Sequence, residues 1–261
     1  MKRSLFVFFV AIVFCCCKRN IPDIAYEGKI ETETTCHPVA VTLNDSFMFS
    51  WPRGILIMDS LLIVHDSYNQ AECFHVFHKD SGTHLKSFGK KGRGPGEFME
   101  VNSFNNNYDG RSVTVFDPNS RKIIVFDMHN ILEETQPRFR ELTVENAPNF
   151  VKQMLPYRGN FIAKGNDDKM RYGIWTPPSD VFSNIYVDYP RLAEDREDNW
   201  SLTDYSAKVR LSPDGRKLIA VTYIGGIMEI FDLNENGFES STIRYFSNLN
   251  TIMHKEHVRI G

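Results

Sequence analysis

The sequence predicts an all-β fold, a β-propeller of four-stranded antiparallel blades, because two series of segments recur along it. Four β-type segments start 51, 48 and 57 residues apart, at Leu61, Ser112, Asn160 and Lys217. A second series starts 49 and then 105 residues apart, as if one copy were weak, at Cys73, Lys122 and Ile227. A repeat of about fifty residues without a long helical period is typical of a propeller blade.

Within each repeat, short runs of β-branched and aromatic residues are bounded by Asp, Asn, Gly and Pro, as in strands joined by turns. In the segment 212–215, "SPDG", the proline presets φ for a turn and the glycine accepts a positive φ at its end. A sandwich or barrel would space its strands by about 8–12 residues without the longer repeat.

The composition is that of a globular protein, with 261 residues of which 42% are hydrophobic and 24% are charged. The formal net charge at pH 7 is -3. Nucleic-acid binding needs an excess of cations, so the composition argues against a nucleic-acid partner.

The first residues have the composition of a secretory signal. Lys2 and Arg3 precede an unbroken apolar run of ten residues, Leu5 to Phe14. That run is too short for a membrane-spanning helix, which needs about 20 residues, and it fits the apolar region of a signal peptide. We therefore divide the chain into a signal at 1–17, a tether at 18–35 and a propeller domain at 36–261.

The signal ends in three cysteines that resemble the lipobox of a bacterial lipoprotein. The bulky Phe14 disfavours cleavage before Cys15, which leaves Cys16 or Cys17 as the lipid acceptor. An ordinary secretory signal and an uncleaved anchor remain alternatives. Beyond the signal, Cys36 and Cys73 form neither a disulfide framework nor a zinc motif, and whether they pair is open.

Two motifs resemble those of known propellers. The segment 88–98, "FGKKGRGPGEF", is similar to a turn of six-bladed β-propeller lipoproteins of Gram-negative gut anaerobes, which are relatives of NHL-repeat propellers. The segment 211–221, "LSPDGRKLIAV", resembles the strand-turn-strand signature of TolB-like blades. The resemblance extends from about Cys36 to Phe246. It implies a six-bladed type, whereas the residues after the signal suffice for fewer than five blades of fifty residues. We therefore expect an incomplete arc of about four blades, with the last blade lacking a neighbour.

The glycine-rich segment 88–98 is predicted to be a structural turn rather than a phosphate-binding loop. It is neither a P-loop nor a dinucleotide fingerprint, because Glu97 stands where a third glycine would be required and Pro95 lacks a backbone donor. We expect it to lead from the outer strand of one blade to the inner strand of the next, with Phe88 and Phe98 in the core. The turn residues are Gly89, Gly92, Gly94, Pro95, Gly96 and Glu97. Anion binding at the rim is the alternative.

Several other polar groups invite a functional interpretation. Acids recur at strand ends, where Asx turns explain them better than a metal ring does; they are Asp66, Asp117, Asp127 and Asp232. Four histidines have no shared strand face and are expected to pack or to lie on the surface; they are His65, His75, His78 and His84. No Ser/His/Asp arrangement stands out. We expect no metal and no cofactor.

The most distinctive segment outside the repeat is 170–200, which is rich in aromatic residues. Aromatic side chains are effective binding anchors; packing between blades is the alternative. The candidates are Tyr172, Trp175, Tyr186, Tyr189 and Trp200.

Together these features predict an envelope lipoprotein with a non-catalytic propeller that binds a protein, a glycan or a small ligand at its face. The resemblance to lipoproteins implies a lipid anchor in the membrane. Lys18 and Arg19 are basic, whereas tethers of surface-exported lipoproteins tend to be acidic, so we expect an outer-membrane protein that faces the periplasm. The alternative is a metal-dependent propeller hydrolase or lyase resembling gluconolactonase or strictosidine synthase.

Overall fold

The computed structural model describes most of the chain between residues 42 and 245. The described ranges are 26–27, 37, 40, 42–69, 71–107, 109–145, 151–165, 170–187, 189, 206–223, 227–235 and 237–245, with backbone only at 26–27 and 240–245.

The described chain is all β and forms four blades of antiparallel strands. Blade 1 consists of β2 (Pro52–Met58), β3 (Leu61–Asp66), β4 (Phe74–His78) and β5 (His84–Phe88). Blade 2 consists of β6 (Ser103–Asn106), β7 (Ser112–Asp117), β8 (Lys122–Asp127) and β9 (Phe139–Thr143). Blade 3 consists of β10 (Gln153–Tyr157), β11 (Asn160–Lys164), β12 (Tyr172–Thr176) and β13 (Val181–Tyr186). Blade 4 consists of β14 (Ala207–Leu211), β15 (Lys217–Thr222), β16 (Ile227–Asn234) and β17 (Gly237–Tyr245).

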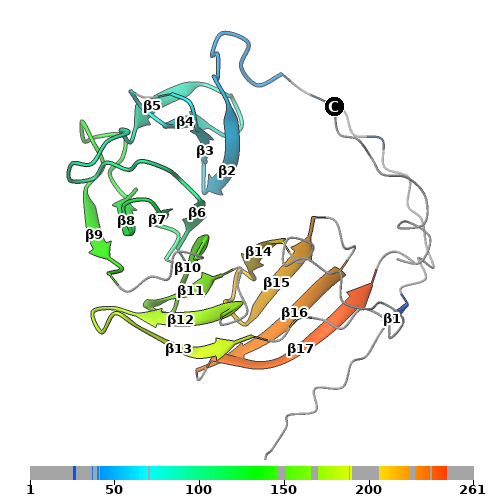
Figure 1. Cartoon of the computed structure of the whole chain (residues 1–261). Coiled ribbons are helices and arrows are strands. Elements are labelled where there is room, and N and C mark those ends of the chain that lie inside the picture. The colour runs from blue at the N-terminus through cyan, green and yellow to red at the C-terminus, as the bar shows by residue number, and fades with distance from the viewer. Residues whose placement is uncertain are drawn as a thin grey trace, which may run out of the picture.

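The blades follow one another around an axis and form an arc (Figure 1). The first strands of the blades, β2, β6, β10 and β14, lie on the inside of the arc, and blades 1 and 4 stand on either side of its open part. The prediction of an all-β propeller with four four-stranded blades is confirmed. Within the described ranges, no helix is long and apolar enough to cross a lipid bilayer.

The repeating segments of the sequence are the second and third strands of the blades. The four segments of the first series are β3, β7, β11 and β15, and those of the second series are β4, β8 and β16. The weak copy of the second series is β12, whose sequence YGIWT contains only one β-branched residue before its last position. These central strands are buried on both faces in blades 1 and 2, which explains their continuous apolar runs.

The core lies between the blades as three clusters. The blade 1–2 cluster is centred on Phe74, Phe88 and Val115, and the blade 2–3 cluster on Phe116 and Met154. The blade 3–4 cluster contains aromatic and aliphatic side chains of both blades; its large members are Tyr172, Leu218 and Phe231. Each blade is therefore stabilised by its neighbour, as in other repeat architectures.

A short strand lies inside the predicted tether. β1 (Tyr26–Glu27) pairs in parallel with the outer strand β17, opposite Arg244 and Tyr245, and makes blade 4 a five-stranded sheet. Of the tether expected at 18–35, the structure describes only the two residues of β1. The free edge of an outermost strand offers unpaired backbone groups, which explains why it accepts another segment.

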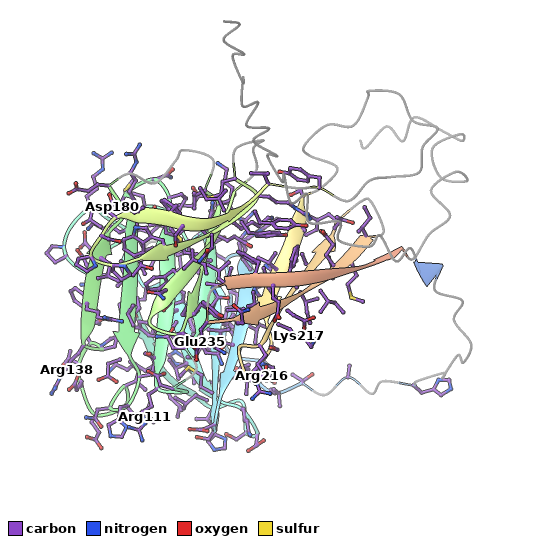
Figure 2. The ribbon with its side chains drawn as sticks, turned by 90° about the horizontal axis from the view of Figure 1, so that it is seen from below. Arg111, Arg138, Asp180, Arg216, Lys217 and Glu235 are labelled. Carbon is purple, nitrogen blue, oxygen red and sulfur yellow. The ribbon has the colours of Figure 1, made fainter. Side chains whose placement is uncertain are left out.

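Figure 2 views the blades from the side, so that the two faces of the propeller are the upper and lower edges. Asp180, in the connection between β12 and β13, lies at one face, whereas Arg111 and Arg138 lie at the opposite face. Charged side chains thus lie on both faces of the propeller (Figure 2), whereas the three hydrophobic clusters fill the space between the sheets.

Candidate functional site

The inner strands of the blades surround two cavities on the axis side of the arc. The first, the Asn106 cavity, has a volume of about 320 Å³ and lies among β6, β10 and β14. The second, the Arg53 cavity, has a volume of about 300 Å³ and is lined by all four blades. Arg210 of β14 lines both cavities, which makes them neighbours along the inner strands.

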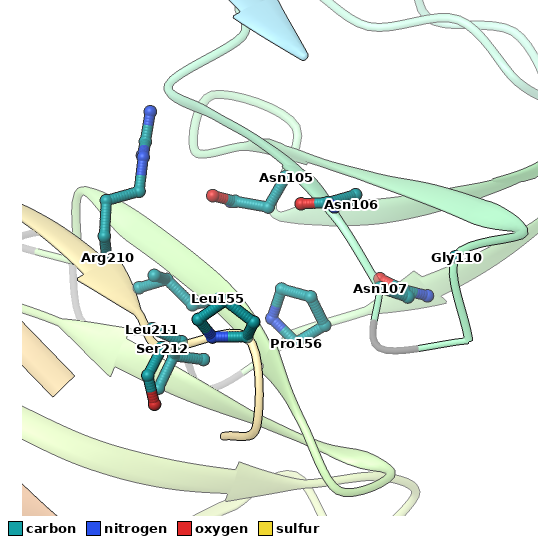
Figure 3. A pocket seen from close by; sticks show the side chains of 10 residues that line it. Asn105, Asn106, Asn107, Gly110, Leu155, Pro156, Arg210, Leu211 and Ser212 are labelled. Atoms are coloured by element: carbon teal, nitrogen blue, oxygen red, sulfur yellow. The ribbon is translucent and has the colours of Figure 1, made fainter. Parts of the chain in front are cut away.

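The Asn106 cavity is polar on its β6 side. Figure 3 shows the carboxamides of Asn105 and Asn106 on the side of the cavity across from Arg210, with Pro156 of β10 between the two sides. The Asn105 amide donates to the carbonyl of Met154 and is therefore fixed. Asn106 is exposed and, in the described part of the chain, makes no side-chain hydrogen bond.

The Arg53 cavity is cationic. Arg53 reaches it from β2, and Lys208 and Arg210 reach it from β14. The remaining lining includes His65, Gln153 and the exposed ring of Tyr223, and no Asp or Glu among the residues that the structure describes. The whole chain has a negative net charge, whereas the cavity at the axis of the arc is lined by positive side chains.

Alternation along β14 directs its cations to the axis. Ala207 and Val209 are buried against blade 3, whereas Lys208 and Arg210 point the other way and are exposed. A two-residue period follows from the strand pleat. The sequence AKVRL therefore packs blade 4 with its small apolar residues and presents two cations on the opposite face of the same strand.

The titration of two side chains reflects this environment. Burial, followed by the charges of Lys91 and Arg53, lowers the pKa of His65 to about 4, so its imidazole is neutral at pH 7. Partial burial and the neighbouring Arg210 lower the pKa of Lys208. Both shifts have a contribution from like charges, which is expected where cations gather, although the neighbouring Asp66 carboxylate opposes the shift of His65.

Backbone N–H groups of the glycine-rich turn already donate hydrogen bonds to acceptors within the protein. The Gly94 N–H donates to Glu97 Oε2 at 2.8 Å, and the Gly96 N–H donates to Glu141 of β9. Gly92, close to the same Glu97 carboxylate, bonds through its N–H to the Phe98 carbonyl at 3.1 Å. The donors that would cradle a phosphate are thus directed at protein acceptors.

The same turn connects β5 to β6, the outer strand of blade 1 to the inner strand of blade 2. Phe88 and Phe98 are fully buried at its two ends. Gly89 has φ +79°, and Pro95 is exposed. The turn therefore connects two blades, and its aromatic ends belong to the core between them.

The aromatic segment is mostly packing. Tyr172 and Trp175 are each only 1% exposed, and Tyr186 lies against Phe231 and Phe238 of blade 4. Binding by Tyr172 or Trp175 as surface anchors is therefore a prediction that the fold corrects: on strand β12 both rings face neighbouring sheets. Neither they nor Tyr186 lines an axial cavity.

The two remaining candidates of the segment differ from these. The Tyr189 ring lies 4.8 Å from the Arg171 guanidinium, a cation–π contact. Trp200 lies outside the described residues.

Strand-end acids bind backbone amides, as the Asx-turn interpretation predicts. Asp117 Oδ1 accepts from the N–H groups of Asn119 and Ser120, at 2.9 and 3.2 Å, and Asp127 Oδ1 accepts from His129 at 2.9 Å. Asp232 instead pairs with Lys217.

Asp66 and Asp117 also fix the entry to an inner strand. Asp66 accepts from the N–H groups of Ser50 and Trp51 before β2, both at 2.7 Å, and Asp117 Oδ2 accepts from Met99 before β6, also at 2.7 Å. Within the described ranges, no group of three or more His, Cys, Asp or Glu side chains could hold a metal ion.

A serine and two histidines meet in blade 1, which sequence reasoning missed. Ser87 Oγ lies 2.7 Å from His75 Nδ1 and 2.9 Å from His84 Nε2. The expectation that these histidines share no face was wrong for His75 and His84. A register shift between β4 and β5 brings them together, since Phe77 pairs with His84 while His75 pairs with Ser87.

This cluster does not have the geometry of a catalytic triad. His75 Nε2 lies 4.0 Å from Asp66 Oδ2, too far for a hydrogen bond. Both oxygens of Asp66 already accept backbone N–H groups, and the Phe47 ring covers His75 at 4.7 Å. Burial lowers the pKa of His75, so the imidazole is a neutral, packed group.

Cys73 is a free, fully buried thiol. Its Sγ bonds to the Asn69 carbonyl at 2.9 Å, and burial raises its pKa to about 11. Cys16, Cys17 and Cys36 lie outside the described residues.

Comparison with known proteins places the fold. Residues 39–161 match the sequence model of a family described as "6-bladed beta-propeller". No curated protein matches the chain. A candidate exported protein of Bacteroides fragilis is similar in structure, with a TM-score of 0.51 and 17% identity, over 78% of this chain and 53% of that one.

Two further structures resemble the chain more distantly. A candidate 6-phosphogluconolactonase of Bacteroides uniformis has a TM-score of 0.46 and 12% identity, over 75% of this chain and 55% of that one. An auxiliary nutrient binding protein of Bacteroides ovatus has a TM-score of 0.45 and 12% identity, over 75% and 42%. The chain thus spans about half the length of these structures. It has a β-propeller fold, and its residues 39–161 match the model of a 6-bladed beta-propeller family, in agreement with the resemblance of the turn motif at 88–98 to propellers of that kind.

Proposed function

We propose that the chain is an envelope lipoprotein whose propeller is a non-catalytic binding module, with its ligand held in the axial cavities. The observation that carries the proposal is the convergence of strands from all four blades on one polar cavity. Ligand sites in proteins are concave and are lined by groups from several elements.

The available groups suit binding better than turnover. The described residues of the axial lining offer cations, amides and one exposed tyrosine, and none of them supplies a carboxylate that could act as a general base. The one nearby imidazole, His65, is held neutral by burial and is only 4% exposed. A catalytic role for the Ser87 cluster would require an Asp66 to His75 hydrogen bond that this geometry does not provide.

The proposed location rests on the N-terminal sequence. A cationic start, ten apolar residues and a cysteine triplet support export and a lipid anchor at Cys16 or Cys17. The similar Bacteroides fragilis structure is that of a candidate exported protein, which agrees with this location. We place the chain at the outer membrane, facing the periplasm, with a protein, glycan or small ligand as its partner.

A cavity-filling variant tests the binding proposal. Purified protein would be titrated calorimetrically with a panel of neutral sugars, sugar acids, sugar phosphates and short peptides. Asn106→Trp should abolish the binding found for the wild type, because the indole would occupy the Asn106 cavity. Asn130→Trp, at an exposed position away from the axis, is the matched control and should bind normally.

The same preparation tests the absence of catalysis. Lactones and esters would be supplied with and without calcium or zinc. Binding without turnover supports the proposal, whereas metal-dependent turnover would favour a propeller hydrolase. If no member of the panel binds, or if both variants bind like the wild type, the axial site is wrong.

A further inference from the structure

We propose that the axial cavities bind a small polyhydroxylated anion, with its carboxylate, phosphate or sulfate group among Arg53, Lys208 and Arg210 and its hydroxyls toward Asn106 and Gln153. This inference deepens the proposed function and rests on it.

The charge of the lining is the first argument. Three cations from two blades line a single cavity of about 300 Å³, and the described residues contribute no acidic side chain to its lining. In the described part of the chain none of the three forms an ion pair, whereas Lys217 and Arg138, at exposed positions elsewhere, pair with Asp232 and Glu134. Unpaired cations that crowd one another favour an anionic partner.

The origin of these cations in two blades is the second argument. Arg53 lies on the first inner strand and the other two lie on the last, and the same cavity contacts all of them. An anion held there would contact cationic side chains from two blades on opposite sides of the cavity. A guanidinium can donate two parallel hydrogen bonds to a carboxylate or phosphate, which adds directionality to the charge.

Unused hydrogen-bonding capacity is the third argument. Gln153 Oε1 is buried and has no partner among the described residues, although Gln153 lines the cationic cavity. Asn106, across the adjoining cavity from Arg210 (Figure 3), is exposed and makes no side-chain hydrogen bond within the described ranges. In contrast, Asn107 is engaged by Ser112 and Thr114. Amide groups of this kind recognise hydroxyls because they can both donate and accept.

Size limits the ligand. Volumes of about 320 and 300 Å³ lie at the lower end of small-molecule sites. A sugar acid, sugar phosphate or sugar sulfate combines this size with one anionic group and several hydroxyls. The three share one recognition chemistry, and the test separates them.

The test compares matched anionic and neutral sugars by calorimetry. The probes are galacturonate, glucose 6-phosphate and glucose 6-sulfate, with galactose and glucose as neutral counterparts. At least one anionic probe should bind about tenfold or more tightly than its neutral counterpart, because a charge-assisted hydrogen bond is stronger than a neutral one. Its affinity should fall severalfold as salt is raised, since partly exposed charges are screened.

Charge-neutral variants locate the binding. Arg210→Gln and Arg53→Gln should each weaken binding about tenfold, and the double variant more, because each removes one cation from the anion. Arg140→Gln, an exposed arginine on the outer strand β9, is the matched control and should leave the affinity unchanged. Neither axial arginine has an ion pair in the described chain, so unfolding midpoints should remain close to that of the wild type.

The outcomes separate this inference from the proposed function. Neutral sugars or peptides that bind at the axis, as judged by Asn106→Trp, while the anions do not, would overturn the anionic ligand and keep the binding module. Anion binding that is unaffected by Arg53→Gln and Arg210→Gln would also overturn it. If nothing in either panel binds, both proposals are wrong.

Discussion

Arg171 and Glu229 form a two-point ion pair that joins blade 3 to blade 4 in the interior. Arg171 Nη1 donates to Glu229 Oε1 at 2.9 Å, and Nη2 donates to Oε2. Their side chains are only 2% and 1% exposed. Arg171 immediately precedes β12 and Glu229 lies on β16, so the pair connects the third strands of neighbouring sheets.

Breaking this pair should strongly destabilise the protein. Glu229→Gln leaves the Arg171 guanidinium buried beside a neutral amide, and loss of one partner of a buried pair costs about 3–5 kcal/mol of unfolding free energy. Urea unfolding, followed by circular dichroism, measures the change. The matched control is Glu134→Gln, which removes an exposed pair with Arg138 and should cost at most about 1 kcal/mol. Equal effects of the two substitutions would contradict the assignment.

The strand-end acids should differ in their contribution to stability, although they occupy similar positions in the repeat. Asp117→Ala removes the acceptor of three backbone N–H groups at a fully buried site and should cost about 2–4 kcal/mol. Asp127→Ala removes one such bond at an exposed site and should cost less than about 1 kcal/mol. Thermal and urea unfolding of both variants would decide, and a larger loss for Asp127→Ala would refute the account.

His65 should make the fold sensitive to acid. Its pKa is about 4 in the folded protein, below the usual histidine value of 6.5, because the side chain is buried and because Lys91 and Arg53 lie nearby; Asp66 opposes this shift. The unfolded chain therefore binds more protons between those values, and stability falls as the pH is lowered from about 6.5 to about 4. The full loss from this group is about 3 kcal/mol.

The variant His65→Gln tests this coupling. It should flatten the dependence of the urea midpoint on pH between about 6.5 and about 4, because glutamine does not titrate there. An identical acid slope in wild type and His65→Gln would show that other groups dominate.

Two glycines with the same backbone angle should respond differently to alanine. Gly89 and Gly159 have φ +79° and +80°, so both substitutions incur the strain of a left-handed conformation. A Cβ at Gly89 would lie 2.7 Å from the Phe74 ring, whereas at Gly159 it would meet nothing within 4 Å. Gly89→Ala should therefore lower the unfolding midpoint clearly more than Gly159→Ala. Equal midpoints would contradict this account, because they would mean that the turn at residue 89 accommodates the Cβ without a loss of stability.

The sequence predicts the central strands best because their environment is uniform. β3 and β7 are contained in segments "LLIVHD" and "SVTVFD", which are apolar throughout since both faces of each strand are covered. The outer strand β5, with sequence HLKSF, and the inner strand β6, with sequence SFNN, lack this signal. Each has a face toward solvent or the axis, and its composition resembles that of a loop.

The candidate site could not be predicted because its residues are isolated in the sequence. Arg53 and Arg210 are separated by most of the chain, and each is a single cation in a strand. Only the curvature of the arc (Figure 1) brings them to one cavity. The aromatic segment 170–200 presents the opposite case. Tyr172 and Trp175 are conspicuous in the sequence, but in the structure they pack in the core between sheets.

Lipidation is the prediction that connects the N-terminal sequence to the cell. If the cysteine triplet is a lipobox, export from the native host should attach lipid at Cys16 or Cys17, because Phe14 disfavours cleavage before Cys15. Metabolic labelling with a palmitate analogue should mark the wild type and should fail on the double variant Cys16→Ala/Cys17→Ala. Cys73→Ala is the matched control and should be labelled normally, because Cys73 is buried in blade 1 of the folded protein. Equal labelling of the wild type and the double variant would exclude a lipid anchor at these residues.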